Sequence, residues 1–226
     1  MPSLFPLGPY LLLLFLLLLV LPSHSYLLPP RPLTSATALR SKLGVQSGST
    51  PGIYLLGTGS ATPKTYISNV DLEDVVETSD EWIQTRTGIG GRRVLLHDSS
   101  ETLVTLGVQS GKNALEMSGV PPEEIDMVIN CCSSPDDIFG DGTSIASSLG
   151  CHNAVAFDLT AACSGFLFGL VTATNFMSSP ATSPRPVRNV LVVGSDALSR
   201  WVDWGDRNSC ILFGDGSGAV VMSTEE

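Results

Sequence analysis

The clearest place for chemistry in this sequence is a cysteine between an apolar segment and a helical pattern. Residues 156–170 read Ala-Phe-Asp-Leu-Thr-Ala-Ala-Cys-Ser-Gly-Phe-Leu-Phe-Gly-Leu, so we expect Cys163 at or near a helix N-terminus. The helix dipole and the unpaired amide groups at that position favour a thiolate, which is the nucleophilic form of cysteine. The small neighbours Ala162 and Ser164 leave room for a substrate. The alternative is a small buried core cysteine, the usual environment of a free cysteine.

A second pair of residues suits the binding of a nucleotide. Trp82 and Arg86 lie four apart in an expected short helix over 79–86, which Ser79 caps, so both side chains share one face. A flat indole beside a guanidinium can stack an adenine and hold a phosphate. The alternative is a surface tryptophan packed under an arginine stem. Arg92 and Arg93 are expected to be solvated rather than to contact phosphate.

The elements that must position these residues alternate between strands and helices, which indicates an α/β layered fold with buried strands. The expected strands cover 53–56, 125–131, 155–159 and 189–194, with a final strand pair at 210–213 and 219–222; the expected helices cover 71–77, 79–86, 100–117, 143–149 and 163–177. The last of these helices carries almost no charge, so we expect it to be buried. Gly57-Thr58-Gly59 is expected to form a turn, and it lacks the third glycine of a dinucleotide-binding loop.

Five segments in a fixed order carry a family resemblance. They are Gly57-Thr58-Gly59-Ser60, the stretch Thr-Ser-Asp-Glu-Trp-Ile-Gln-Thr-Arg-Thr-Gly-Ile at 78–89, the Cys163 segment, Val-Val-Gly-Ser-Asp at 192–196 and Phe-Gly-Asp-Gly-Ser-Gly-Ala at 213–219. Together they resemble beta-ketoacyl-acyl-carrier-protein synthase III over roughly 53–221. The resemblance implies the thiolase fold, in which two similar halves stack in layers. This chain is expected to carry the first, N-terminal half, a mixed sheet packed by helices.

The resemblance also implies roles for individual residues. Cys163 matches the nucleophile, and Trp82 and Arg86 match residues that grip the nucleotide end of coenzyme A. Arg207 matches a second coenzyme A contact, and Thr78 is expected to line the same tunnel mouth.

Phe139 matches an aromatic residue that one subunit of the family's dimer lends to the acyl pocket of its partner. The sequence departs from the family here, because Gly140-Asp141-Gly142 is not the usual continuation and one residue is missing before Cys163. A core phenylalanine is therefore the alternative for Phe139.

The reaction that the resemblance implies starts type II fatty acid synthesis in two steps. The thiolate takes the acetyl group of acetyl-coenzyme A; malonyl-acyl carrier protein then loses carbon dioxide and attacks that thioester, giving acetoacetyl-acyl carrier protein. Splitting the reaction in this way is the usual advantage of covalent catalysis. The substrates imply no separate cofactor, and the full-length enzyme is expected to be a homodimer.

Decarboxylation in the family uses a His and an Asn of the second half. The three histidines, His24, His97 and His152, do not match that catalytic His, so we expect both groups to be absent from this chain. The chain is then a fragment that an acyl thioester can still modify at Cys163 but that cannot condense.

Composition narrows the classes of function. The net charge is −10, with 43% hydrophobic and 15% charged residues, which is typical of a globular protein and excludes a basic nucleic-acid-binding surface. The odd number of cysteines argues against a disulfide framework, and no Cys/His spacing suits zinc, so no metal is expected. The adjacent Cys131 and Cys132 should point to opposite faces of a strand.

The N-terminal segments have the composition of a targeting leader. Residues 1–25 contain a leucine-rich run typical of a signal peptide, and 26–50 resemble a transit peptide, since the first carboxylate of the chain is Asp71. The thiolase-like domain is expected over 51–226. This arrangement resembles the bipartite leader of algal proteins that reach a plastid through the secretory pathway, so we expect a plastid stroma. Secretion or a membrane anchor is the alternative.

Two other functions stay open. One is a related thiolase-superfamily acyltransferase that makes a polyketide-type product; the other is a non-catalytic half-domain that binds a full-length partner. Carrier protein is acidic and docks on basic surface, of which this half offers little beyond Arg185 and Arg188.

Overall fold

The computed structural model describes residues 52–97, 100–178 and 186–225. The leader segments predicted over 1–25 and 26–50 lie outside these residues. Among the residues that are described, no helix is both long enough and apolar enough to cross a membrane.

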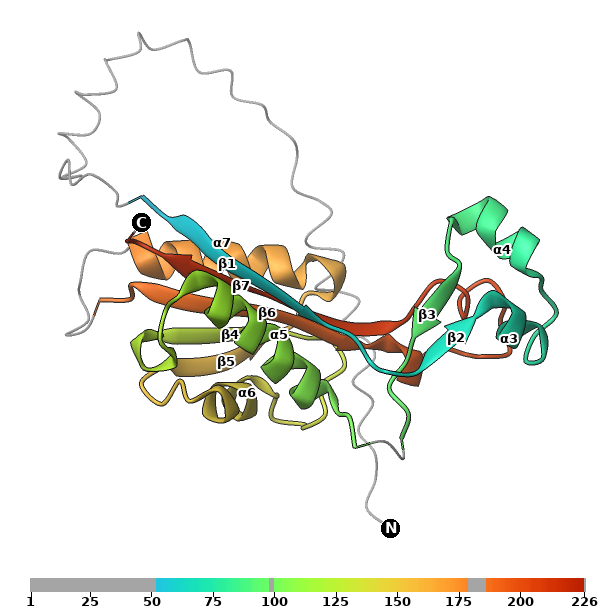
Figure 1. Cartoon of the computed structure of the whole chain (residues 1–226), viewed down its shortest axis with the longest axis horizontal. Helices are drawn as coiled ribbons and strands as arrows, with labels where there is room; N and C mark the ends of the chain where they lie inside the picture. The colour runs from blue at the N-terminus through green and yellow to red at the C-terminus, as the bar shows by residue number, and fades with distance from the viewer. Residues whose placement is uncertain (1–51, 98–99, 179–185, 226) are drawn as a thin grey trace, which may run out of the picture. The chain divides into compact units, whose positions relative to one another are not determined.

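A five-stranded mixed sheet forms the centre of the fold (Figure 1). Its strands are, in spatial order, β1 (Tyr54–Ala61), β7 (Asp215–Ser223), β6 (Asn189–Ala197), β4 (Met127–Cys131) and β5 (Val155–Leu159). Strand β4 pairs in parallel with β5 and β6, whereas β7 pairs antiparallel with β6 and β1. The expected mixed sheet is confirmed.

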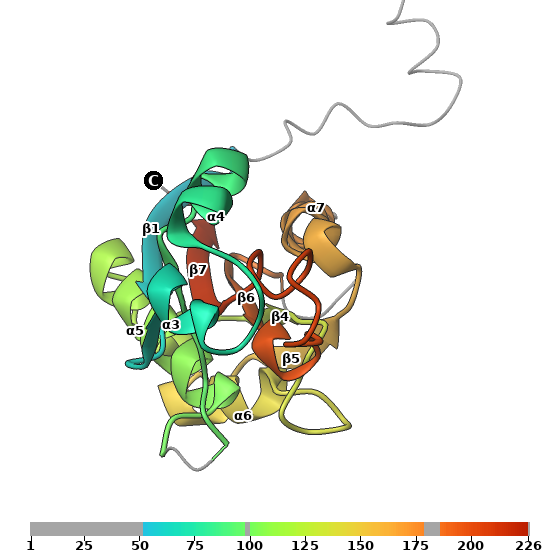
Figure 2. The same cartoon turned by 90° about the vertical axis from the view of Figure 1, so that its right-hand side faces the viewer.

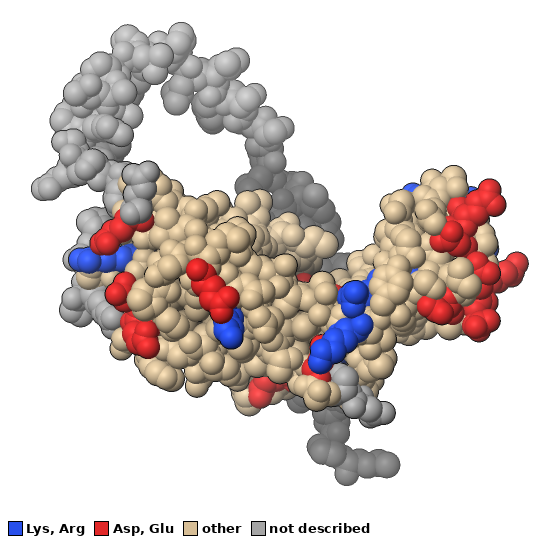
Figure 3. All heavy atoms as spheres, viewed as in Figure 1, with Lys and Arg blue, Asp and Glu red and all other residues tan. Residues whose placement is uncertain are grey.

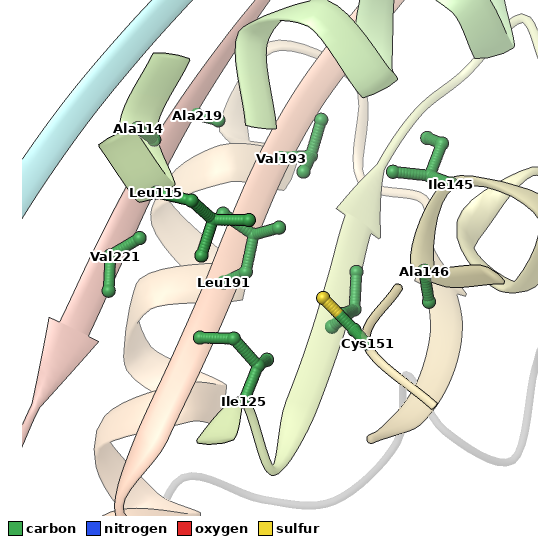
Figure 4. Close-up of a cluster of buried hydrophobic side chains, with 11 residues drawn as sticks. Ala114, Leu115, Ile125, Ile145, Ala146, Cys151, Leu191, Val193, Ala219 and Val221 are labelled. Carbon is green, nitrogen blue, oxygen red and sulfur yellow. The ribbon is translucent and has the colours of Figure 1, made fainter. Parts of the chain in front are cut away.

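Helices cover both faces of this sheet. Helices α5 (Leu103–Ser118) and α6 (Gly142–Leu149) lie on one face and α7 (Gly165–Ser178) lies on the other (Figure 2). Successive side chains of a strand point to opposite faces of the sheet, so one strand contributes to both cores. Val128 belongs to the core under α5 and α6, and its neighbour Ile129 belongs to the core under α7. Figure 4 shows the first of these cores, in which side chains of α5 and α6 meet those of β6 and β7.

A smaller group of elements carries the predicted nucleotide site. It consists of the antiparallel pair β2 (Tyr66–Ser68) and β3 (Gly91–Arg93) with helices α3 (Asn69–Glu73) and α4 (Asp80–Thr87). Ser79 caps α4 as expected, because its hydroxyl accepts from the amide of Trp82 at 3.1 Å. Short 3-10 turns lie at η1 (Pro122–Glu124), η2 (Ala162–Ser164) and η3 (Leu198–Arg200).

Arg92 is buried, so the expectation of a solvated side chain was wrong. Only 6% of the residue is exposed. Its guanidinium donates to Asn69 Oδ1 at 2.8 Å and to the carbonyls of Ile67 and Ile211. Burial lowers the pKa of Arg92, and the side chain braces the β2–β3 pair against the segment before β7.

The expected turn at residues 57–59 is also wrong, because β1 continues through these residues, with an irregularity in its pairing between Leu55 and Gly57. A Cβ at Gly57 would lie 2.3 Å from the carbonyl oxygen of Ala114, and one at Gly59 would lie 2.1 Å from that of Ser110. These glycines therefore let the backbone of α5 lie directly against the strand, a role that close packing requires and no turn signal reveals.

The expected strand pair at the C-terminal end is a single strand. Residues 210–212 form turns, with the Cys210 amide donating to the Asp206 carbonyl, while β7 continues through Gly216 and Gly218. Hydrogen bonding to β1 on one side and β6 on the other outweighs the low strand propensity of glycine.

Helix α7 is only half buried, contrary to expectation. Gly165, Gly169, Ala173 and Met177 form its buried face. The opposite face leaves Leu167 63% exposed. Low charge therefore did not mean burial: only one side of the helix meets the sheet.

Candidate active site

Cys163 lies where the sequence placed it, between β5 and α7. Strand β5 ends at Leu159, the turn η2 contains Cys163, and α7 begins two residues later at Gly165. The thiol thus sits at the N-terminal end of a helix whose dipole favours negative charge. The residue is exposed, which excludes the alternative of a buried core cysteine.

The backbone before the thiol is held in an unusual conformation. Ala162 has a φ of 47°, and it is the one non-glycine residue with positive φ in the described part of the chain. A side chain is disfavoured in this region by about 1–2 kcal/mol. Thr160 anchors the turn, since its hydroxyl donates to the carbonyl of Cys132 at 2.7 Å. The surrounding structure therefore stabilises a strained approach to Cys163.

The other four cysteines differ from Cys163 in environment. All are buried, and burial raises the pKa of Cys131 to about 11, that of Cys132 to about 12 and that of Cys151 to about 11. Burial also raises the pKa of Cys210. Cys131 ends β4 and Cys132 follows it directly, and the two belong to different apolar clusters. These thiols stay protonated and inaccessible at neutral pH, so Cys163 is the candidate nucleophile.

The residues predicted to bind a nucleotide come together in the structure. The guanidinium carbon of Arg86 lies 4.3 Å from the centroid of the Trp82 ring, and that of Arg207 lies 4.5 Å from it. Arg207 Nη1 also donates to the Glu77 carbonyl at 3.0 Å. Two cationic groups and one aromatic face therefore converge, although Arg207 is distant in sequence.

Thr78 lies beside this cluster. It follows Glu77 in the chain, and its hydroxyl oxygen is buried with no hydrogen-bond partner among the described residues. Arg86 covers the Trp82 ring, as the alternative of a packed surface tryptophan also predicts, and Arg207 adds a second guanidinium over the same ring.

Phe139 is 94% exposed, which excludes the alternative of a core phenylalanine. Its loop is ordered by Asp141, whose carboxylate accepts from the amides of Asp136 at 2.8 Å and Asp137 at 3.0 Å. Burial raises the pKa of Asp141. A fixed loop therefore presents Phe139 and the neighbouring Ile138, 90% exposed, away from their own core.

Sequence reasoning missed the role of Asp158. Its carboxylate accepts from Asn130 Nδ2 at 2.7 Å and from the amides of Asp141 at 3.0 Å and Gly142 at 2.6 Å. The residue therefore joins β4, β5 and the start of α6, next to the Phe139 loop. The available signal was an acidic residue inside an otherwise apolar strand.

The described ranges hold no cluster of metal ligands, and their histidines lie at the surface. No group of three or more His, Cys, Asp or Glu side chains in these ranges could hold a metal ion. His97 and His152 are both exposed. Figure 3 shows acidic side chains gathered over the end of the molecule that carries α3 and α4, where Asp71, Glu73, Asp74, Glu77 and Glu81 are exposed.

Comparison with known proteins gives a consistent result. A family model described as 3-oxoacyl-[acyl-carrier-protein (ACP)] synthase III matches residues 157–226. A beta-ketoacyl-[acyl-carrier-protein] synthase III of Microcystis aeruginosa is 52% identical over 174 residues, covering 77% of this chain and 50% of the relative. One of Prochlorococcus marinus is 54% identical over 171 residues, covering 76% and 48%.

Solved structures agree with the sequence matches. The 3-oxoacyl-[acyl-carrier-protein] synthase III of Aquifex aeolicus has a TM-score of 0.70 at 42% identity, covering 76% of this chain and 54% of that one. A priming beta-ketosynthase of a polyketide biosynthetic pathway has a TM-score of 0.71 at 36% identity, covering 80% and 52%. The chain thus spans about half the length of the curated relatives it matches.

Proposed function

This chain belongs to the beta-ketoacyl-[acyl-carrier-protein] synthase III family, and we propose that it carries the acyl-loading machinery of a condensing enzyme that starts fatty acid synthesis. The observation that carries the proposal is the contrast among its cysteines. Cys163 is exposed at the start of α7, while the other four thiols are buried.

The loading step follows from this position. The Cys163 thiolate attacks the carbonyl carbon of acetyl-coenzyme A, and the developing oxyanion accepts a hydrogen bond from the Cys163 backbone amide. Collapse of the tetrahedral intermediate breaks the bond to the coenzyme A sulfur. Coenzyme A leaves as a thiolate and takes up a proton from solvent, and the acetyl group stays on Cys163 as a thioester. No separate cofactor takes part.

The cluster around Trp82 supplies the binding site for the nucleotide end of coenzyme A. An adenine ring stacks well on an indole or a guanidinium, and Arg86 and Arg207 supply positive charge for the phosphates. Their charge is needed here, because α3 and α4 carry many carboxylates. Thr78 lines the tunnel mouth at this binding site.

Condensation requires more than these residues. Malonyl-acyl carrier protein is the second substrate, and it forms an enolate when it loses carbon dioxide. A His and an Asn stabilise this enolate, and neither matches a described residue. Phe139 completes the acyl pocket of a partner subunit in a homodimer, which accounts for its exposure.

The end of the domain that carries α3 and α4 does not suit the docking of an acidic carrier protein. That surface is acidic over α3 and α4, and Arg188 forms an ion pair with Glu225 at 3.4 Å. Arg185 lies outside the described residues.

The proposed site of action is a plastid stroma. The relatives from Microcystis, Synechococcus and Nostoc are cyanobacterial proteins, which is compatible with a plastid origin. The leader composition supports delivery through the secretory pathway. Fusing residues 1–70 to a fluorescent protein tests this, with plastid fluorescence expected; signal in the medium contradicts it.

A polyketide-type acyltransferase is the second candidate, favoured by the similarity to a priming beta-ketosynthase. Acyl-coenzyme A thioesters of increasing chain length separate the two: a fatty acid initiator loads acetyl groups fastest, and a preference for a longer starter favours the second candidate.

The loading activity can be measured on the full 226-residue chain. Mixing it with acetyl-coenzyme A should release one equivalent of free coenzyme A thiol per chain. Cys163→Ala should abolish this release, while Cys151→Ala, which changes a buried thiol, should preserve it. Release that survives Cys163→Ala overturns the proposal. With malonyl-acyl carrier protein added, we expect no acetoacetyl product from this chain alone.

A further inference from the structure

A buried carboxylate at the start of β7 holds two separate segments together. Asp215, 7% exposed, accepts hydrogen bonds from the Leu95 amide at 2.7 Å, the Ser199 amide at 2.9 Å and the Ser199 hydroxyl at 2.6 Å. Leu95 and Ser199 both line a cavity of about 670 Å³. The Asp215 carboxylate therefore fixes the distance between the Leu95 and Ser199 segments of the cavity lining.

The contacts continue from Ser199 toward the nucleotide cluster. The Ser199 carbonyl accepts from the indole Nε1 of Trp204 at 3.1 Å. From there to Arg207 the chain makes a compact turn, in which the Asp206 amide donates to the Asp203 carbonyl. Arg207 then reaches the Glu77 carbonyl and the Trp82 ring. A short series of fixed groups thus links Asp215 to Arg207.

We propose that Asp215 is a positioning residue that sets Arg207 over Trp82 through Ser199 and Trp204, and so tunes recognition of the nucleotide end of an acyl-coenzyme A. This inference rests on the proposed function. The carboxylate can accept all three hydrogen bonds, whereas an asparagine must turn an N–H group toward one of these donors. That conflict displaces Ser199, and the displacement passes along the 199–207 segment to Arg207.

The test compares two thioesters in the full chain. Acetyl-coenzyme A carries the nucleotide and acetyl-pantetheine does not, so the rate of Cys163 acylation by each separates positioning of Arg207 from general damage. Asp215→Asn should slow acylation by acetyl-coenzyme A about five- to tenfold, and acylation by acetyl-pantetheine less than about twofold. Equal slowing with both thioesters overturns the proposal.

Two further variants keep the outcome decisive. Trp204→Phe removes the indole N–H together with part of the ring, and it tests the link if Asp215→Asn fails to fold. It should slow acylation by acetyl-coenzyme A more than acylation by acetyl-pantetheine, and an unchanged ratio of the two rates overturns the proposal. Asp126→Asn is the matched control, because Asp126 also accepts two backbone amides, those of Arg188 and Asn189, but at the start of β6. Asp126→Asn should leave the ratio of the two acylation rates unchanged. Selective slowing with acetyl-coenzyme A in this variant counts against the proposal.

The benchmark variant is Arg207→Ala. The wild type should prefer acetyl-coenzyme A, and Arg207→Ala should lose that preference, as the proposed function requires. If Asp215→Asn and Trp204→Phe keep the preference, the inference fails and the proposed function stands. If the wild type shows no preference between the thioesters, the proposed coenzyme A site fails, and the inference fails with it.

Discussion

The guanidinium of Arg207 stacks on the indole of Trp82, with 4.5 Å between the guanidinium carbon and the ring centroid. An adenine that uses this indole must enter between the two groups or displace one of them. The stack therefore holds the site in a compact form before the nucleotide binds. Separating Arg207 from Trp82 costs free energy, which offsets part of the binding energy of the nucleotide.

Replacing Arg207 should weaken coenzyme A binding more than replacing an arginine elsewhere. We expect Arg207→Ala to raise the dissociation constant of coenzyme A about tenfold, because one stacking partner and one positive charge are lost. Isothermal titration calorimetry measures this directly. Arg188→Ala, which removes an exposed arginine paired with Glu225, is the control and should leave the constant unchanged. Equal weakening by both variants would show a diffuse charge effect.

Gly59 should not tolerate a side chain. A Cβ there would lie 2.1 Å from the Ser110 carbonyl oxygen, so β1 and α5 must separate. We expect Gly59→Ala to lower the free energy of unfolding by about 2–3 kcal/mol, measured by urea denaturation. Gly216→Ala is the matched control, because its Cβ would lie an ordinary 3.6 Å from the Ala61 carbonyl oxygen. Similar losses in both variants would contradict the close-approach argument.

The sequence predicts the position of Cys163 well, and the reason is local. A short apolar strand, small residues and an uncharged helical pattern place the thiol between β5 and α7, as the structure shows. The Trp82–Arg86 pair is equally local, since both residues lie on α4. Patterns within one element were therefore sufficient for these features.

Features that depend on distant contacts were harder to predict. Gly57 and Gly59 look like turn residues until α5 is seen against them, and β7 passes through glycines because it has a neighbour on each side. The family resemblance alone placed Arg207 among the coenzyme A contacts, and its stack on Trp82 needed the structure. The role of Asp215 needed the structure, because its partners lie far away in the sequence.

Ala162 should gain stability when its side chain is removed. Its φ of 47° disfavours alanine by about 1–2 kcal/mol, and glycine removes that cost while making the unfolded chain more flexible by about 0.4–1 kcal/mol. We therefore expect Ala162→Gly to raise the free energy of unfolding by about 0.5–1 kcal/mol in urea denaturation. Ala161→Gly, at a φ of −152°, is the control and should not stabilise. A loss of stability in Ala162→Gly would mean that the turn is not strained.

The buried thiols should make the fold sensitive to alkaline pH. Burial raises the pKa of Cys132 from its usual 9.0 to about 12, so between these values the thiol ionises in the unfolded chain but not in the folded one. Below pH 9 both states keep the proton and nothing changes. As pH rises above this value, stability falls by up to about 1.4 kcal/mol per pH unit for this thiol.

Urea denaturation at about pH 8 and about pH 10 checks this expectation. Cys132→Ala should make the fall in stability smaller. Ser148→Ala, which shortens an exposed side chain of α6 that does not titrate, should leave it as in the wild type. A fall that is identical in all three proteins would assign the alkaline sensitivity to other groups.

The most direct test of the account is to locate the acyl group. The full chain is incubated with acetyl-coenzyme A, digested at mildly acidic pH and mapped by mass spectrometry. A single acetyl thioester on the peptide that contains Cys163, with the peptides of the four buried cysteines unmodified, is the predicted result. Acetylation spread over several cysteines, or a Cys163 peptide that stays unmodified in folded protein, would contradict it.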